Sequence, residues 1–132
     1  MPEDVYLNRS EGYIYIRSYG IVTLEELQRA LEQVLVYQRE SQVQVLLIDT
    51  REQERVPDVK EHYQFLQSVP SDLHIAILTN RKTETHGNQM FFAEAGRYKG
   101  KSVQLFSEER DAKKWIADRT GACIKFKVQR AG

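Results

Sequence analysis

Three short runs of apolar residues divide the chain and predict the strands of a parallel sheet. The first, VQVLLID, runs from Val43 to Asp49 with almost no polar alternation, and the others are LHIAIL at 73–78 and SVQLF at 102–106. A strand is apolar on both faces when helices cover both sides of its sheet. We therefore expect a layer of mostly parallel strands with 43–49 as its central strand.

The first 20 residues alternate between apolar and polar positions and predict a hairpin. Strands are expected at 4–9 and 12–19, joined at Ser10-Glu11-Gly12, where glycine supplies the positive φ of a short turn. In the second strand the tyrosines at 13, 15 and 19 share one face with Arg17. We interpret this stripe as the half-exposed face of an edge hairpin. The alternative is a recognition surface, because tyrosine combines a large contact area with a polar tip.

Apolar residues at helical spacing predict four helices packed on the sheet. Thr23 with Glu26 forms a capping box that opens the first helix, and Asp58 with Glu61 offers the same signal after Pro57. A polar connection is expected at 50–56, the third helix at 83–98, and the fourth after 107. The order of elements is that of an α/β domain at 1–120.

The last 12 residues carry an unexpected alternation. Ile124, Phe126 and Val128 alternate with polar residues, which predicts an extra strand within 121–132. Two arrangements remain open: the strand extends the edge of the hairpin, or it crosses to a second copy of the chain. In either case something has to cover its apolar face.

Polar residues follow two of the predicted strands and make the candidate binding site. The carboxyl ends of neighbouring parallel strands meet at one edge, where α/β proteins bind ligands. The candidate residues are Asp49, Thr50 and Arg51 after the central strand, Thr79, Asn80 and Arg81 after the next one, and His86 in the opening turn of the third helix. Two arginines and nearby helix N-termini favour an anion. The simpler interpretation is that loops are polar.

Composition narrows the class of protein. The 132 residues fit one domain, and a single cysteine, Cys123, excludes an intramolecular disulfide and predicts a reducing, cytoplasmic location. The start of the sequence lacks the features of a signal peptide, and no apolar run is long enough to span a membrane. Residues 1–96 hold nine basic and 15 acidic side chains and 97–132 hold ten and four, so the overall charge balances. No basic and aromatic interleaving predicts nucleic-acid binding.

Several sequence features together resemble the SpoIIAA-like family, which has the STAS-type fold. They are Gly20-Ile21-Val22-Thr23 opening a long helix, LLIDTRE ending the central strand, HIAILTN, and Phe106-Ser107-Glu108 followed by Ala112 and Trp115-Ile116. The resemblance covers about residues 4–118. It implies a small α/β domain that regulates or binds other proteins.

The chain also departs from that family in one respect. The best-known members are switched by phosphorylation of a serine at the start of the helix after the central strand. Residues 49–58 contain no serine, and Thr50 is their only hydroxyl, so the resemblance does not extend to this switch. Lipid-transfer domains of similar fold hold an apolar ligand behind gate helices, for which this chain leaves little room.

The sequence favours a non-catalytic regulatory or protein-binding module. We expect a protein partner or a second copy of the chain, with a small anion or lipid at the strand-end edge as the alternative. An enzyme is not expected, because no nucleophile and base stand together and no phosphate-binding, dinucleotide-binding or metal-binding spacing is present. No cofactor and no metal are expected.

Overall fold

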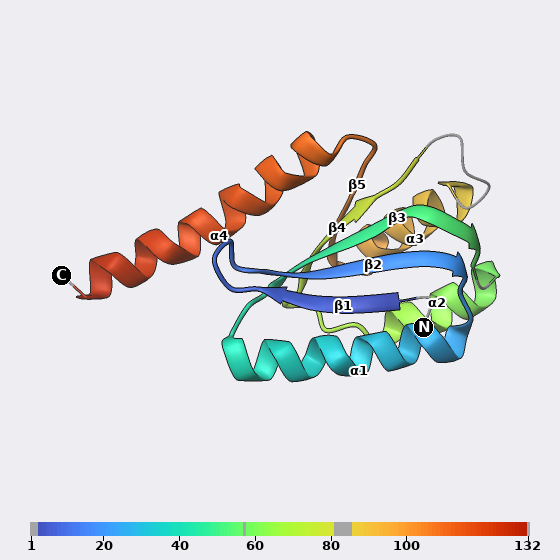
Figure 1. Ribbon diagram of the computed structural model, residues 1–132, viewed down its shortest axis with the longest axis horizontal. Coiled ribbons are helices and arrows are strands. Elements are labelled where there is room, and N and C mark those ends of the chain that lie inside the picture. Colours follow the sequence, from blue (N-terminus) through green and yellow to red (C-terminus); the bar gives the residue numbers. More distant parts are fainter. Residues whose placement is uncertain (1–2, 57, 81–85, 132) are drawn as a thin grey trace.

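The computed structural model describes residues 3–56, 58–80 and 86–131, which form a five-stranded sheet and four helices (Figure 1). The strands are β1 (Glu3–Asn8), β2 (Tyr13–Ile21), β3 (Val45–Arg55), β4 (His74–Leu78) and β5 (Ser102–Phe106). The helices are α1 (Leu24–Ser41), α2 (Val59–Gln67), α3 (His86–Tyr98) and α4 (Glu109–Ala131).

The strands lie in the order β1-β2-β3-β4-β5. Strand β1 runs antiparallel to β2, and the other neighbours are parallel. The predicted hairpin and the central position of β3 are confirmed. Gly12 closes the hairpin turn with a φ of +76°, which is the positive value that made glycine the expected residue there.

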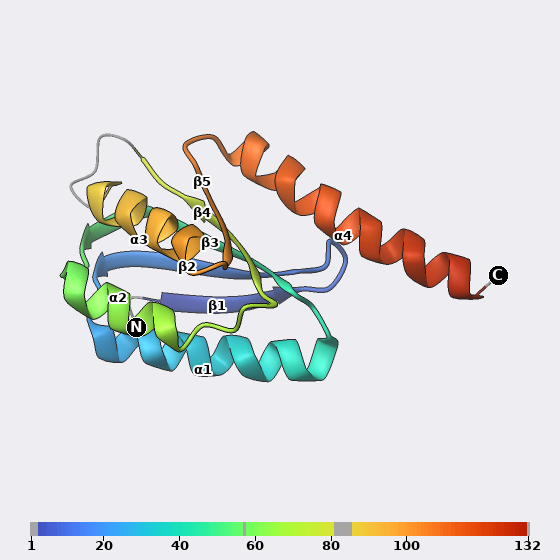
Figure 2. The same ribbon diagram turned by 180° about the vertical axis from the view of Figure 1, so that it is seen from behind.

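Helices cover both faces of the sheet. On one face, α1, α2 and α3 lie side by side (Figure 2) and enclose a core that includes Val34, Leu66 and Ile75. On the other face, α4 places Ala112 and Ile116 against the opposite side chains of the same strands. Burial on two sides explains why the inner strands are apolar without alternation.

The predicted helix starts at Thr23 and Asp58 are confirmed. Thr23 Oγ1 accepts a hydrogen bond from the Glu26 backbone N–H at 3.2 Å, and Asp58 Oδ1 accepts one from Glu61 at 2.9 Å. Each bond satisfies a backbone donor that has no partner within the helix. Pro57 lies outside the described residues, as does the predicted start of the third helix before His86.

The expectation of a polar connection at 50–56 is wrong, because β3 continues to Arg55. Its pairing with β2 shifts on the way: Arg17 faces Asp49, whereas Tyr19 faces Glu52. Strand β3 therefore contains one extra residue at this point, a β-bulge, and the pairing shifts again between Gly20 and Ile21. The bulge brings Gln53, only 6% exposed, to the face covered by α1, α2 and α3.

The predicted C-terminal strand is also wrong, because α4 continues as a helix to Ala131 and extends beyond the sheet (Figures 1 and 2). Short apolar alternations do not distinguish strand from helix when the segment continues an existing helix. Elongating a helix that is already nucleated is far easier than starting a new element.

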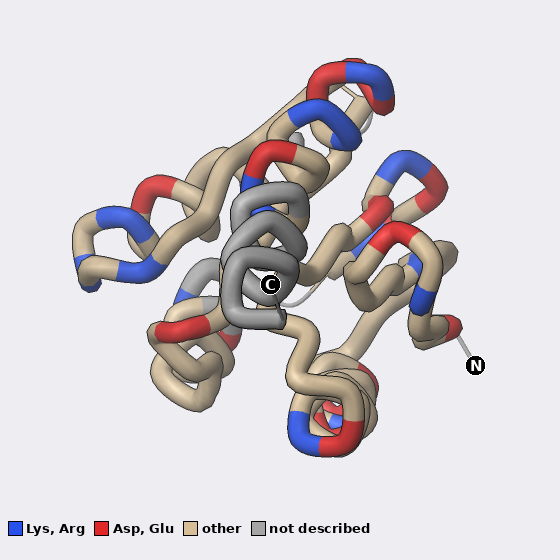
Figure 3. Tube along the Cα trace, turned by 90° about the vertical axis from the view of Figure 1, so that its left-hand side faces the viewer, with Lys and Arg blue, Asp and Glu red and all other residues tan. Residues whose placement is uncertain are grey.

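Acidic and basic residues are interspersed over the described part of the chain (Figure 3). The separation of charge along the sequence therefore does not become two oppositely charged halves among these residues.

Candidate functional site

Asp49 and Arg51, which lie within β3, form an ion pair on the face of the sheet that carries α4. Arg51 donates to Asp49 Oδ1 from Nε at 2.9 Å and to Oδ2 from Nη2 at 2.8 Å, and its backbone N–H also reaches Oδ1. The Tyr15 hydroxyl donates to Asp49 Oδ2 at 3.0 Å. Glu109, at the start of α4, lies 3.5 Å from Arg51. Two carboxylates thus neutralise this arginine.

These contacts fix the ionisation of the network. Burial works to raise the pKa of Asp49, but the hydrogen bonds from Arg51 and Tyr15 outweigh it and hold the pKa below its ordinary value of 3.8. Burial and the Asp49 carboxylate together raise the pKa of Tyr15 to about 12. Asp49 is therefore a stable carboxylate whose oxygens are occupied by donors, which is a poor state for a general base.

Among the remaining predicted site residues, Thr50 and Thr79 are held elsewhere in the fold. Thr50 points to the opposite face, where its hydroxyl donates to the Leu78 carbonyl at 2.8 Å. Thr79 is fully buried, and its backbone N–H donates to the Phe106 carbonyl. Asn80 is exposed at the end of the described segment. Arg81 lies outside the described residues, and so does the side chain of His86, whose backbone opens α3.

A groove between the hairpin and α4, which we call the hairpin groove, opens beside the ion pair. It has a volume of about 480 Å³. Its lining residues are Tyr6, Leu7, Asn8, Arg9, Tyr13, Tyr15, Leu47, Glu109 and Lys113. The groove exists because α4 packs on β3, β4 and β5 and leaves part of β1 and β2 uncovered. Its size falls within the range of small-molecule pockets.

Tyrosines form much of the wall of the hairpin groove. The rings of Tyr6 and Tyr15 stack with centroids 6.1 Å apart, and Tyr6 remains 52% exposed. Tyr13 is 5% exposed and belongs to the core beneath α4. The tyrosine stripe predicted from the sequence therefore runs from the core into an open surface, on the inner strand of the hairpin that forms this edge of the sheet.

Arg17 extends the same face beyond the groove. Its guanidinium pairs with Glu52 at 2.6 Å and Asp4 at 3.6 Å, and lies 4.6 Å from the centre of the Tyr19 ring. The Arg17 guanidinium is therefore already occupied by groups of the chain itself.

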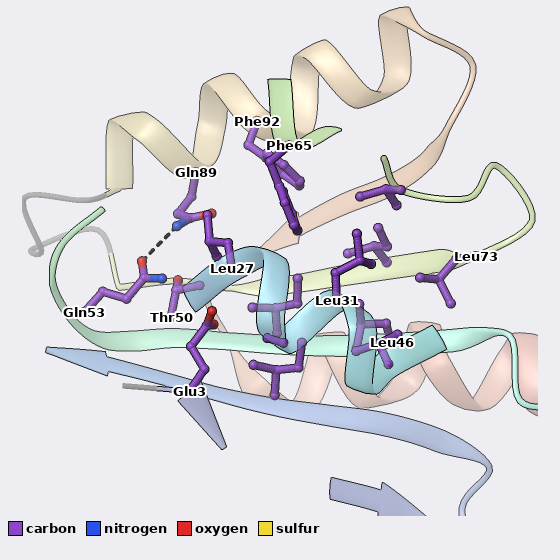
Figure 4. Close-up of a pocket in the computed structure, with 16 residues that line it drawn as sticks. Glu3, Leu27, Leu31, Leu46, Thr50, Gln53, Phe65, Leu73, Gln89 and Phe92 are labelled. Atoms are coloured by element: carbon purple, nitrogen blue, oxygen red, sulfur yellow. Dashed lines mark hydrogen bonds between the residues drawn. The ribbon is translucent and has the colours of Figure 1, made fainter. Parts of the chain in front are cut away.

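The opposite face of the sheet holds a buried polar chain that the sequence did not reveal. Gln89 of α3 donates to Gln53 Oε1 at 2.8 Å, and Gln53 donates to Ser18 Oγ at 2.8 Å. The Ser18 hydroxyl in turn hydrogen-bonds the Glu3 carboxyl group. Figure 4 shows Glu3 pointing toward Thr50, with the Gln53–Gln89 bond at the upper left of the two.

This polar chain lies at one end of a cavity of about 40 Å³ between the sheet and α1, α2 and α3. The rest of the cavity is apolar, with Leu31, Phe65 and Phe92 among its walls. At roughly 10–15 Å³ of such volume per water molecule, it has room for about three waters. A lipid chain does not fit this conformation.

Two further findings concern the described residues alone. Histidine, cysteine and carboxylate side chains do not gather there in threes as a metal site requires. Nor is any helix in that part of the chain long and apolar enough to cross a membrane.

Comparison with known proteins shows the fold and little more. No protein-family model matches the sequence, and no curated protein matches it. Among solved structures, the chain is similar to an uncharacterized DUF3478-family protein with a SpoIIAA-like fold from Shewanella loihica PV-4. The TM-score is 0.57 at 16% identity, over 86% of this chain and 91% of the other. The chain thus has the SpoIIAA-like fold expected from its sequence.

Proposed function

We propose that the protein is a non-catalytic, STAS-type protein-binding module that holds a segment of a partner protein in the hairpin groove. The observation that carries this proposal is the groove itself: an open hollow of about 480 Å³ with stacked, exposed tyrosine on one wall. Tyrosine is enriched at protein interfaces because its ring provides contact area at low entropic cost and its hydroxyl bonds to polar groups.

The charges of the hairpin groove favour an acidic partner segment. Glu109 lies 3.5 Å from Arg51, which it shares with Asp49, so only part of its charge is offset. Arg9 and Lys113 line the same hollow, and no carboxylate within the described residues is recorded in an ion pair with either. Two such cations beside aromatic rings fit a peptide in which Asp or Glu neighbours an aromatic or aliphatic side chain.

The alternative of an anion or lipid at the strand-end edge has weaker support. Arg51 already contacts two carboxylates, and a bound anion has to displace one of them. Thr50 and Thr79 are buried and bonded within the fold. The internal cavity is an order of magnitude smaller than the hairpin groove.

Selection from a displayed random peptide library tests the proposal. We expect selected peptides to be rich in Asp or Glu beside an aromatic or aliphatic residue. The double variant Tyr6→Ala/Lys113→Glu should raise their Kd at least about tenfold, since it removes an aromatic contact and reverses a charge. Fluorescence anisotropy with a labelled selected peptide measures this change. Both side chains are exposed, so the variant should fold.

The matched control is Tyr98→Ala/Lys114→Glu, which makes the same chemical changes outside the groove. Tyr98 is 93% exposed on α3, and Lys114 is exposed on α4 without lining the groove. The control should bind as the unmodified protein does. Equal affinities for the groove variant and the control would refute the hairpin groove as the binding surface.

A further inference from the structure

Strand β1 forms a free edge of the sheet, and its side chains alternate between the two faces of the sheet. Val5 packs into the core beside α1, while Tyr6, the next residue, lines the hairpin groove. Because successive side chains of a strand point to opposite faces, the docking of one set positions the other. Glu3 belongs to the set that faces α1, and it lines the internal cavity.

We propose that Glu3 and the buried polar chain beneath it form a proton-controlled latch, which holds β1 against α1 while the carboxyl group is protonated and loosens when it ionises.

The hydrogen bonds of the polar chain run in one direction and end on Glu3. Ser18 Oγ accepts from Gln53, so its own proton is available to the carboxyl group. The remaining carboxyl oxygen, Glu3 Oε1, is buried without a hydrogen-bond partner among the described residues. An ionised carboxylate with an unpaired buried oxygen is costly, whereas the neutral acid is tolerated far better.

A carboxylate that acts on Glu3 has the same sign of charge. Glu26, in the first turn of α1, acts on Glu3 electrostatically, and its Oε2 is also buried without a partner in the described structure. Strands β2 and β3 and helix α3 present the neutral residues Ser18, Thr50, Gln53 and Gln89 to this end of the cavity. The charged neighbours Asp4 and Arg17 pair with each other on the opposite face of the sheet. The described groups facing Glu3 thus offer no cation to offset ionisation.

The pKa of Glu3 places this change near neutrality. Burial, and then repulsion by Glu26, outweigh the Ser18 hydrogen bond and raise the pKa from 4.5 to about 7. The folded state therefore binds a proton that the unfolded state has already lost between these two values, and stability falls as the pH rises through that range. The full difference corresponds to about two orders of magnitude in the folding equilibrium constant.

Urea unfolding from pH 5 to pH 8 tests the latch with the isosteric variant Glu3→Gln, which stays neutral throughout. The unmodified protein should lose stability across this range relative to the variant, which should be the more stable of the two at pH 8. Parallel pH profiles would overturn the proposal. Glu26→Gln gives an independent test, because removing the like charge should move the transition of Glu3 to lower pH. If the transition stays at the same pH in Glu26→Gln, this result would count against electrostatic coupling between Glu3 and Glu26.

Hydrogen exchange distinguishes a latch from a general loss of stability. After correction for the intrinsic effect of pH, amides of β1 should lose protection between pH 6 and pH 8 more than amides of β4, and Glu3→Gln should suppress the difference. Equal losses in both strands would overturn the local opening. These measurements require no partner.

A consequence for binding rests on the function proposed above. If β1 loosens, Tyr6 is no longer held in place, so the affinity of a selected peptide should fall from pH 6 to pH 8 in the unmodified protein and fall less in Glu3→Gln. Failure of the library selection would refute the groove and leave the stability and exchange tests of the latch unaffected. Binding with the same pH dependence in both proteins would refute the coupling.

Discussion

At the scale of single residues, Asp49 shows that a residue predicted to bind a ligand at a strand end can have a structural role within the strand. It is 7% exposed and receives hydrogen bonds from Arg51 and Tyr15, so its charge is stabilised within the fold. The bond from Tyr15 also joins β2 to β3, because Tyr15 and Asp49 belong to these two strands. The network therefore supports the wall of the hairpin groove without needing a ligand.

Removing one of these donors should cost stability in a pH-dependent way. Tyr15→Phe should lower the free energy of unfolding at pH 7 by about 1–2 kcal/mol, since a bond to a buried charge is lost. The pKa of Asp49 is held below 3.8, so its stabilisation is present above that value and is lost as the pH falls through the folded pKa. The difference between the two proteins should accordingly shrink in acid. Urea unfolding at several pH values measures it, with Tyr6→Phe as the control on an exposed tyrosine. A Tyr15→Phe protein as stable as the control would contradict this account.

At the scale of elements, close packing between α3 and β5 depends on a glycine. A Cβ atom added at Gly96 would lie 2.8 Å from Val103 Cγ2, closer than side chains approach. Val103 is 3% exposed and β-branched, so it has little freedom to move aside. The small residue lets the helix lie close to the edge strand.

Gly96→Ala should therefore destabilise the protein by about 1–3 kcal/mol through overpacking. The control is Gly87→Ala in the first turn of the same helix, where a Cβ atom meets none of the described residues within 4 Å. Alanine favours helix over glycine, so Gly87→Ala should be neutral or stabilising by up to about 1 kcal/mol. Thermal and urea unfolding of both variants give the comparison. Equal effects at the two positions would show that the contact with Val103 is unimportant.

At the scale of the whole molecule, one sheet separates two cores. Ile75 belongs to the core beneath α1, α2 and α3, and Ile116 of α4 belongs to the core on the other face. Both side chains are at most 2% exposed. If the domain unfolds as one unit, damage to either core lowers the same free energy of unfolding.

Ile75→Val and Ile116→Val should each lower the stability by about 0.5–1.5 kcal/mol. Because the two sites lie on opposite faces without shared packing partners, the double variant should show their sum to within about 0.5 kcal/mol. Urea unfolding followed by fluorescence of Trp115 and by circular dichroism checks both points. Transitions that differ between the two probes would show that the cores unfold separately.

The sequence by itself determined the apolar runs of the sheet, the starts of α1 and α2 and the fold class. Apolar runs such as 45–48 and caps such as Thr23 and Asp58 act locally, through burial and through backbone donors a few residues away. It also placed Asp49 and Arg51 at one candidate site, but the ion pair between them was not predicted. The alternation of apolar and polar residues at 124–129 led to the wrong prediction of a strand. The continuation of α4 as a helix overrides such a short two-residue repeat.

Only the tertiary structure decided which residues meet. A bulge in β3 turned Gln53 toward the helix-covered core. There it forms a hydrogen-bonded chain with Ser18, Gln89 and Glu3, which lie far apart in the sequence. The fold also separated Thr50 from Asp49 and Arg51, because Thr50 points to the face of the sheet covered by α1, α2 and α3. Strand alternation is fixed by local geometry, but the position of a bulge and the reach of α4 over the sheet depend on packing between distant segments. The hairpin groove and the Glu3 latch both arise from that packing.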